Sequence, residues 1–284
     1  MATEDKNSME YWVFSLGDPE LYHFYTAQAE NTSLYYALCI EECMEDFSYD
    51  RKEIMHLRNK CILLINSYLV PVFCQLPLKG YLIALTEAFC ELDEIKALLR
   101  IVFFHDTPEG IIDLGSMNEQ QEQCMELIYK EYHNNEPDDL QIPILRNLTV
   151  NLFLMSSVEK LTKPLRAGHL MGYALQFMDL VNEYAFIEKQ KDFYAKKIGI
   201  TEKTLTLALH TIYQKTFREI LTYKTLIEAI KMLVFTDQNI TQIAHDLNYD
   251  VSGFNKLFLK WKGMYPKDLR INYQKLIEHV KNNF

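Results

Sequence analysis

The feature that most constrains this chain is a repeat near its C-terminus. Tyr194, Ala195, Ile198, Gly199, Leu205 and Leu209 recur 49 residues later as Ile243, Ala244, Leu247, Asn248, Phe254 and Phe258. Each copy predicts a short amphipathic helix with a small alanine on its inner side, a turn, and a second helix with apolar residues four apart. Two copies at a fixed separation are far more specific than one, because many α-proteins contain a single helical hairpin.

The residues at the two turns explain the pattern. Gly199 and Asn248 accept a positive φ more cheaply than other residues, and the favoured N-caps Thr201 and Asp250 follow them. The alanine lets the second helix cross closely over the first, and the left-handed residue makes the sharp bend between them. The sequence therefore predicts two helix-turn-helix units, each with a recognition helix for double-stranded DNA.

Residues from Gln176 to Arg270 resemble the DNA-binding domain of the AraC/XylS family of bacterial transcription regulators. The second unit matches better, through residues 240–249, 254–258 and 263–270, and residues 226–233 lie where the family has its linker helix. The sequence departs from the family pattern in four places. Asn248 and Gln214 stand where glycine is usual, Tyr249 replaces a phenylalanine, and Leu207 replaces a basic residue.

The resemblance implies a transcription regulator that reads two successive major-groove segments. It also implies a cupin-like sensing or dimerisation domain over residues 1–160 and a double helix-turn-helix domain over residues 161–284. Control by a small-molecule effector or by dimerisation is expected, as is contact with RNA polymerase if the protein is an activator. The alternative is an adaptor that keeps the fold but acts through protein contacts.

Candidate DNA-binding residues follow from the geometry of a recognition helix, whose N-terminal part meets base edges. Lys203 suits guanine or a phosphate, Leu207 a thymine methyl group and Asn255 an adenine edge. A solvated helix face is the alternative for each polar residue. The candidates on the recognition helices are Lys203, Thr204, Thr206, Leu207, His210, Val251, Ser252, Asn255, Lys256 and Lys260. Thr216, the expected N-cap of the connecting helix, is a candidate for a phosphate.

Charge is divided along the chain. The total is −10, which is unfavourable near phosphates, but residues 186–284 hold 16 Lys and Arg against 10 Asp and Glu. The rest of the chain holds 13 against 29. The division favours a cationic DNA-binding module attached to an acidic domain, with a chance distribution of acidic loops as the alternative.

The first 115 residues predict mainly strands, because their apolar runs are short and rich in β-branched and aromatic residues. The runs are 11–14, 34–40, 61–65, 69–74 and 80–85. A short helix is expected over residues 91–99. The predicted fold is α+β: a cupin-like small β-barrel with two flanking helices, then an all-α domain of two helix-turn-helix units joined by a linker helix.

The two flanking helices are expected over residues 118–133 and 139–157. Each carries an apolar stripe, formed in the second by Ile142, Leu145, Leu148 and Leu152. Packing against the barrel and a homodimer interface both explain such stripes. The family resemblance favours the interface.

No catalytic or cofactor motif stands out, so we expect neither an enzyme nor a cofactor. The eight histidines form no H-x-H or H-E-x-x-H pair, which argues against a metal site, although distant histidines could still assemble one. Six scattered cysteines within apolar runs are typical of buried thiols in a reducing compartment. With no apolar run as long as a membrane span, a cytoplasmic protein is expected.

Overall fold

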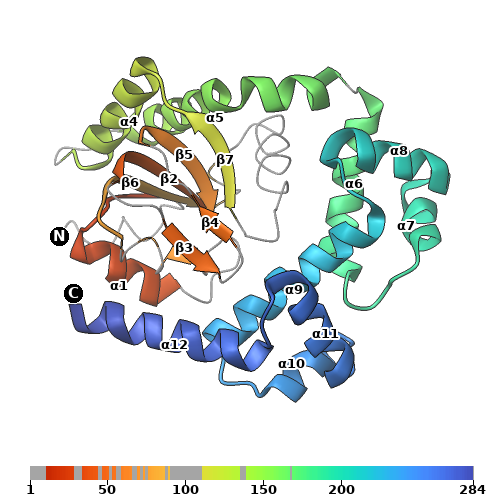
Figure 1. Ribbon diagram of the computed structural model, residues 1–284. Coiled ribbons are helices and arrows are strands. Elements are labelled where there is room, and N and C mark those ends of the chain that lie inside the picture. The colour runs from red at the N-terminus through yellow and green to blue at the C-terminus, as the bar shows by residue number, and fades with distance from the viewer. Residues whose placement is uncertain are drawn as a thin grey trace. The chain divides into compact units, whose positions relative to one another are not determined.

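The computed structural model describes residues 11–28, 34–43, 47–50, 53–55, 59–65, 69–70, 73, 76–86, 89, 111–134, 139–166 and 168–283 (Figure 1). The chain divides into two compact units. Unit 1 holds all the strands of the described residues and residues 111–158, and unit 2 holds the helices from His169 to Glu278. The expected α+β class is confirmed. The boundary at residue 160 stays a prediction.

Unit 1 is built on an antiparallel sheet in the order β1-β6-β2-β5-β7. A separate two-stranded ribbon pairs β3 with β4. The bounds are β1 Tyr11–Ser15, β2 Leu34–Cys43, β3 Phe47–Asp50, β4 Glu53–Met55, β5 Cys61–Ile65, β6 Leu78–Thr86 and β7 Ile111–Ser116.

The central strands are buried on both faces. Residues 36–40 of β2 and 61–65 of β5 are all buried, which explains why these strands read as continuous apolar runs. Gly80 of β6 is required where that strand pairs with β2 opposite Ile40, because a Cβ atom there would lie 2.0 Å from the Cys39 carbonyl oxygen. The sheet is therefore an internal layer.

Helices α4 (Glu119–Tyr132) and α5 (Gln141–Arg166) pack on the sheet in unit 1 (Figure 1). The Tyr11 hydroxyl of β1 hydrogen-bonds to the Thr149 hydroxyl of α5 at 2.6 Å, and both side chains are buried. The Tyr81 ring of β6 lies 4.9 Å from the Tyr129 ring of α4. Burial raises the pKa of Tyr11 well above its usual range, so the hydroxyl stays protonated.

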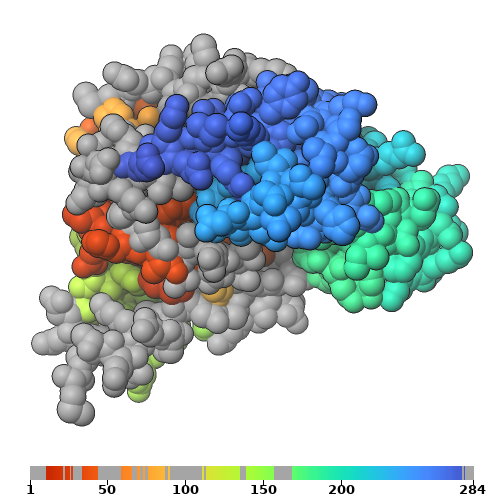
Figure 2. Space-filling model, turned by 90° about the horizontal axis from the view of Figure 1, so that it is seen from below, coloured from red at the N-terminus to blue at the C-terminus, as the bar shows by residue number. Residues whose placement is uncertain are grey.

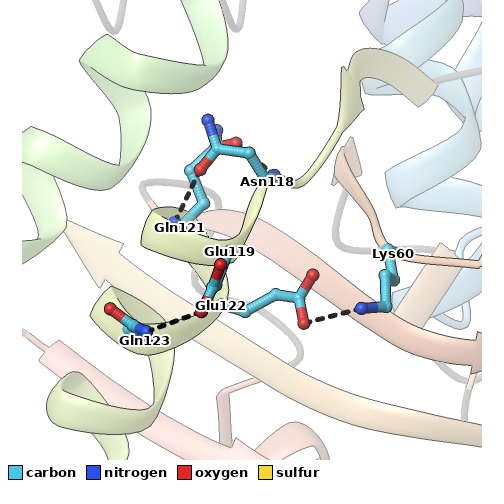
Figure 3. A network of polar contacts seen from close by, with 6 residues as sticks. All are labelled: Lys60, Asn118, Glu119, Gln121, Glu122 and Gln123. Carbon is cyan, nitrogen blue, oxygen red and sulfur yellow. Dashed lines mark hydrogen bonds and ion pairs between the residues drawn. The ribbon is translucent and has the colours of Figure 1, made fainter.

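Helix α4 begins with a capping box at Asn118 (Figure 3). The Asn118 side chain accepts a hydrogen bond from the Gln121 N–H at 3.0 Å, and the Gln121 side chain accepts one from the Asn118 N–H at 2.8 Å. One turn on, Glu122 forms an ion pair of 2.9 Å with Lys60, which directly precedes β5. The cap thus fixes the start of α4 next to the sheet.

The sequence predictions for unit 1 were partly right. The strands expected at 11–14, 34–40, 61–65 and 80–85 and the helix at 118–133 are confirmed. The strand expected at 69–74 is wrong, because residues 69, 70 and 73 are helical. Pro71 cannot donate a ladder hydrogen bond, which disfavours a central strand there. The helix expected at 91–99 lies outside the described residues.

Two further differences concern helices. Helix α5 begins at Gln141 and ends at Arg166, so the expected range of 139–157 started too early and ended too soon. Helix α1 (Pro19–Gln28) was not predicted, although Asp18 accepts a hydrogen bond from the Glu20 N–H and proline is favoured in a first helical turn. Phe24 of α1 packs on the rings of Trp12 and Phe14 of β1.

Unit 2 is entirely helical in its described residues. Its helices are α6 His169–Tyr184, α7 Lys191–Ile198, α8 Glu202–Tyr213, α9 Phe217–Phe235, α10 Ile240–Asp246, α11 Val251–Lys262 and α12 Pro266–Asn283. One core forms where the rings of Phe177, Tyr194 and Phe217 meet at 5.3 to 5.7 Å. Side chains of α9 to α12, in blue, form a continuous surface in Figure 2.

In the part of the chain that the structure describes, no helix combines the length and the apolar character needed to cross a membrane.

Replacing Asn118 by alanine should lower the free energy of unfolding by about 1 kcal/mol, because the Gln121 N–H at the start of α4 loses its side-chain acceptor. Asn118→Asp should keep most of that stability. The measurement is the urea unfolding midpoint of the intact protein, with Gln120→Ala, an exposed residue of the same helix, as the control. Equal midpoints for Asn118→Ala and Gln120→Ala would contradict the role of the cap.

Candidate nucleic-acid interface

The two turns of the repeat have the same backbone structure. Gly199 has a φ of 78° and Asn248 a φ of 60°, both in the left-handed region. After the first turn, the Ile200 N–H donates to the Ala195 carbonyl at 3.0 Å. After the second, the Tyr249 N–H donates to the Ala244 carbonyl at 2.8 Å. These bonds close the last turn of α7 and of α10 and redirect the chain into the next helix.

The equivalence continues through the caps of the recognition helices α8 and α11. Thr201 accepts a hydrogen bond from the Thr204 N–H, and Asp250 accepts one from the Gly253 N–H. Both helices also end in a left-handed residue, Gln214 with a φ of 54° and Gly263 with a φ of 69°. The structural repeat is therefore longer than the matched apolar pattern.

Each recognition helix buries one face and exposes the other. In α8 the buried face includes Leu205, Ala208 and Leu209, and in α11 it includes Phe254 and Phe258. These side chains pack into unit 2 and hold the helices, which leaves the opposite faces available to a partner.

On α8 the structure separates the five candidates into two groups. Lys203, Leu207 and His210 are exposed on the outward face. Thr204 is only half-exposed and its hydroxyl lies 2.9 Å from that of Thr201, so it belongs to the cap. Thr206 is exposed, but its hydroxyl donates to the Glu202 carbonyl at 2.8 Å.

On α11 the candidates occupy the first turns and the outward face. Val251, Ser252, Lys256 and Lys260 are exposed, whereas Asn255 is half-buried. The Lys260 ammonium lies 5.2 Å from the centre of the Trp261 ring, a cation–π distance. Asn255 thus stands at the edge of the outward face and Lys256 at its middle.

A groove of about 570 Å³ lies beside the first recognition helix. The starts of α7 and α9 meet one side of α8 there, from Glu202 to His210. Candidates Thr206, His210 and Thr216 share this groove. Its charged lining is mainly basic, from Lys189, Lys191, Lys215 and Arg218 against Asp192 and Glu202.

The groove contains an internal charge pair. The Lys191 ammonium lies 3.2 Å from a Glu202 carboxylate oxygen and 3.2 Å from the Thr206 hydroxyl. Lys191 is therefore held against α8, and its charge is offset by Glu202. Lys215 and Arg218 have no such carboxylate partner within the lining itself, and these two residues give the start of α9 its basic character.

Thr216 is engaged in a second capping box. The Glu219 carboxylate accepts hydrogen bonds from the Thr216 N–H at 2.7 Å and from the Thr216 hydroxyl at 2.8 Å. The Thr216 N–H bond, more than any other contact, lowers the pKa of Glu219. The ionised carboxylate already occupies the start of α9, so a phosphate in this groove would meet Lys215 and Arg218 more favourably than Thr216.

A basic and aromatic cluster joins the two helix-turn-helix units. The Lys215 ammonium lies 4.9 Å from the Tyr223 ring centre, and the Tyr223 ring lies 5.2 Å from the Trp261 ring. The Lys260 ammonium lies 5.2 Å from the Trp261 ring centre, so Lys215 from just before α9 and Lys260 from α11 contact the same pair of rings. The cluster fixes α11 against α9.

A second link connects the loop before α7 to the turn after α10. The Lys189 ammonium donates to the Ala185 carbonyl at 2.6 Å and lies 5.4 Å from the Tyr249 ring centre. Although much of this side chain is exposed, partial burial of its ammonium group lowers the pKa of Lys189. Lys189 therefore helps to hold the first helix-turn-helix unit against the second.

Sequence reasoning missed the basic residues of the groove. Lys189, Lys191, Lys215 and Arg218 lie outside the recognition helices, close to the starts of α7 and α9. The available signal was the presence of lysine or arginine near two predicted helix starts, where phosphate-binding residues are common.

Residues 194–272 match the model of a helix-turn-helix domain family. No curated protein matches the chain. Among solved structures, the C-terminal domain of the response regulator yesN from Fusobacterium nucleatum is 20% identical, over 33% of this chain and 93% of that one, with a TM-score of 0.32. ToxT from Vibrio cholerae is 12% identical, over 84% of this chain and 89% of that one, with a TM-score of 0.48. A fatty-acid-bound form of ToxT has the same identity and TM-score.

Gly199→Val should lower the free energy of unfolding by about 1–3 kcal/mol, because a β-branched residue is strained at positive φ. Apart from residue 199 and its two chain neighbours, no residue has an atom within 4 Å of the position that a Cβ would occupy, so the loss comes mainly from the strained backbone. Asn248→Gly should be neutral or mildly stabilising. Thermal unfolding tests both.

Gly172→Ala in α6 is the matched control for that experiment, since its Cβ would also meet open space but its φ is outside the left-handed range. It should stabilise the helix slightly. If Gly199→Val and Gly172→Ala unfold at the same temperature, the turn at residue 199 does not depend on a residue that accepts a positive φ.

Proposed function

Because the chain carries an AraC-type helix-turn-helix domain at residues 194–272, we propose that it is a transcription regulator that binds specific double-stranded DNA sequences. Helices α8 and α11 enter successive segments of the major groove. The observation that carries the proposal is the repeated geometry of the two units: equal turns, equal caps and two outward faces free of packing.

The outward faces supply the base contacts in this proposal. Lys203, Leu207 and His210 act from α8, and Ser252, Asn255 and Lys256 act from α11. Asn255 has the side-chain amide that pairs with an adenine edge, and Lys203 can donate to guanine. Val251 meets the base edges from the first turn of α11. Thr204 and Thr206 support α8 through the hydroxyl contacts described above.

In this proposal the basic groove binds the phosphate backbone of the DNA. Lys215 and Arg218 meet the phosphates beside α8, and Lys260 meets them beside α11. Thr216 contributes by holding the start of α9 in place. The positive balance of residues 186–284 supports this arrangement, because phosphate contacts supply most of the non-specific affinity of DNA-binding proteins.

Residues 1–160 form the regulatory domain in this proposal, with residues 161–284 as the DNA-binding domain. Control by a small molecule is supported by Tyr36, whose buried hydroxyl has no hydrogen-bond partner among the described residues. A ligand with a polar group would supply the hydrogen bond that the Tyr36 hydroxyl lacks within the described part of the chain. Native mass spectrometry of the purified protein would identify a co-purifying molecule.

Dimerisation through α4 and α5 is a further part of the proposal. Leu127 of α4, Leu140 just before α5 and Ile144 of α5 are large apolar side chains exposed to solvent in the isolated chain. A symmetric dimer would cover them.

If the protein activates transcription, RNA polymerase is a second partner. The alternative function, an adaptor acting through protein contacts, predicts no affinity for duplex DNA.

A salt titration with a random duplex tests the function. The affinity should fall steeply as salt rises, because each phosphate contact releases counterions.

Asn255→Ala should weaken binding to a selected site by about 1–3 kcal/mol and relax the preference at one base pair. Lys260→Ala should weaken selected and scrambled duplexes alike and reduce the salt slope by about one. Equal losses on both duplexes for Asn255→Ala would make it a positioning residue.

A fragment that begins at Gly168 should fold alone and bind duplex DNA at low salt, because it contains both helix-turn-helix units and the basic groove. Circular dichroism and a gel-shift assay measure the two properties. Lys215→Ala combined with Arg218→Ala in the same fragment should leave the helical signal unchanged and weaken binding. A fragment that is unfolded, or folded without DNA affinity, would contradict the proposed boundary.

A further inference from the structure

The first recognition helix has an aliphatic residue in the middle of its outward face. Leu207 lies opposite the buried Leu205 and Leu209 and is 55% exposed, between Lys203 and His210. Its equivalent in α11, 49 residues later, is Lys256. Since α8 is well ordered by its cap and its core, this leucine is presented to solvent at a fixed position.

The surroundings of Leu207 are polar. Lys203, Thr206 and His210 all lie within one turn of it and all are exposed, so no apolar neighbour on α8 shields the leucine. Thr206 is turned to the Glu202 carbonyl and to Lys191. If this surface faces DNA as proposed, Leu207 can bury its methyl groups there only against an apolar group of the DNA.

Only one base offers such a group in the major groove. Thymine exposes its C5 methyl there, whereas the other bases present hydrogen-bond donors and acceptors. Neither α8 nor α11 contains an arginine, the residue that pairs most often with guanine. The chemistry of α8 therefore suits thymine better than guanine at its central contact.

We propose that Leu207 is a specificity-determining residue that selects thymine through its C5 methyl group. The inference rests on the proposed function. Val251 and Leu259 of α11 are also exposed apolar residues, but they lie towards the two ends of that helix, with Lys256 at its centre. The central contacts of the two helices thus differ: Leu207 of α8 offers an aliphatic side chain, and its equivalent Lys256 of α11 offers a charge.

The test removes only the methyl group. The full-length protein first selects duplexes from a random library, and the enriched duplex is then made with deoxyuridine in place of thymidine in the segment facing α8. Deoxyuridine keeps the hydrogen-bonding edge and replaces the methyl by hydrogen. The wild type should bind the uridine duplex about fourfold more weakly for each contacted methyl. Leu207→Ala should bind both duplexes equally.

Two matched variants complete the experiment. Ile187→Ala removes an exposed aliphatic side chain outside the recognition helices and should keep the wild-type ratio of thymidine to uridine affinity. Lys260→Ala should weaken both duplexes and also keep the ratio. Circular dichroism confirms that each variant is folded.

The outcomes separate the inference from the proposed function. If the wild type binds both duplexes equally, thymine is not selected by its methyl group, while DNA binding stands. If Leu207→Ala keeps the full uridine penalty, another residue reads the methyl and the assignment to Leu207 is overturned. If no duplex binds at low salt, the proposed function fails and the inference fails with it.

Discussion

The arrangement of unit 2 depends on helix α9, which both helix-turn-helix units share. At its start, Phe217 packs on Phe177 and Tyr194 of the first unit. Further along, Tyr223 packs on Trp261 of the second recognition helix. With 19 residues the helix is about 28 Å long, shorter than one turn of B-form DNA at about 34 Å. Helix α9 is therefore a single element that holds both recognition helices. Its buried apolar residues must be kept for either helix-turn-helix unit to stay in position.

The two units share a backbone but differ in the surface they present. The turns at Gly199 and Asn248 and the caps at Thr201 and Asp250 reproduce the same geometry. The basic groove lies beside the first unit. A regulator built in this way could keep its position on DNA while the residues of each recognition helix change, because the residues that set the fold are buried and those proposed to read DNA are not.

The sequence predicted well what local chemistry decides. Turn residues, N-caps and apolar spacing act within a few residues, so the helix-turn-helix units could be placed from the order of the residues alone. The run at 69–74 was mistaken for a strand, because a short apolar run has no periodicity that separates a strand from a buried helix. The groove could not be predicted, since it forms only when the starts of α7 and α9 meet the side of α8. Nor could spacing show that the Thr206 hydroxyl is occupied by its own helix.

The contact between Lys189 and Tyr249 has a consequence for how operators can vary. It ties the loop before the first helix-turn-helix unit to the turn of the second, so it opposes independent rotation of the two recognition helices about α9. DNA turns once in about 10–10.5 base pairs, and an added base pair between two half-sites changes their helical phase as well as their distance. A protein whose two recognition helices keep one relative orientation fits half-sites that have one helical phase relative to each other. Its operators should then tolerate base changes within a half-site more readily than a single insertion between them.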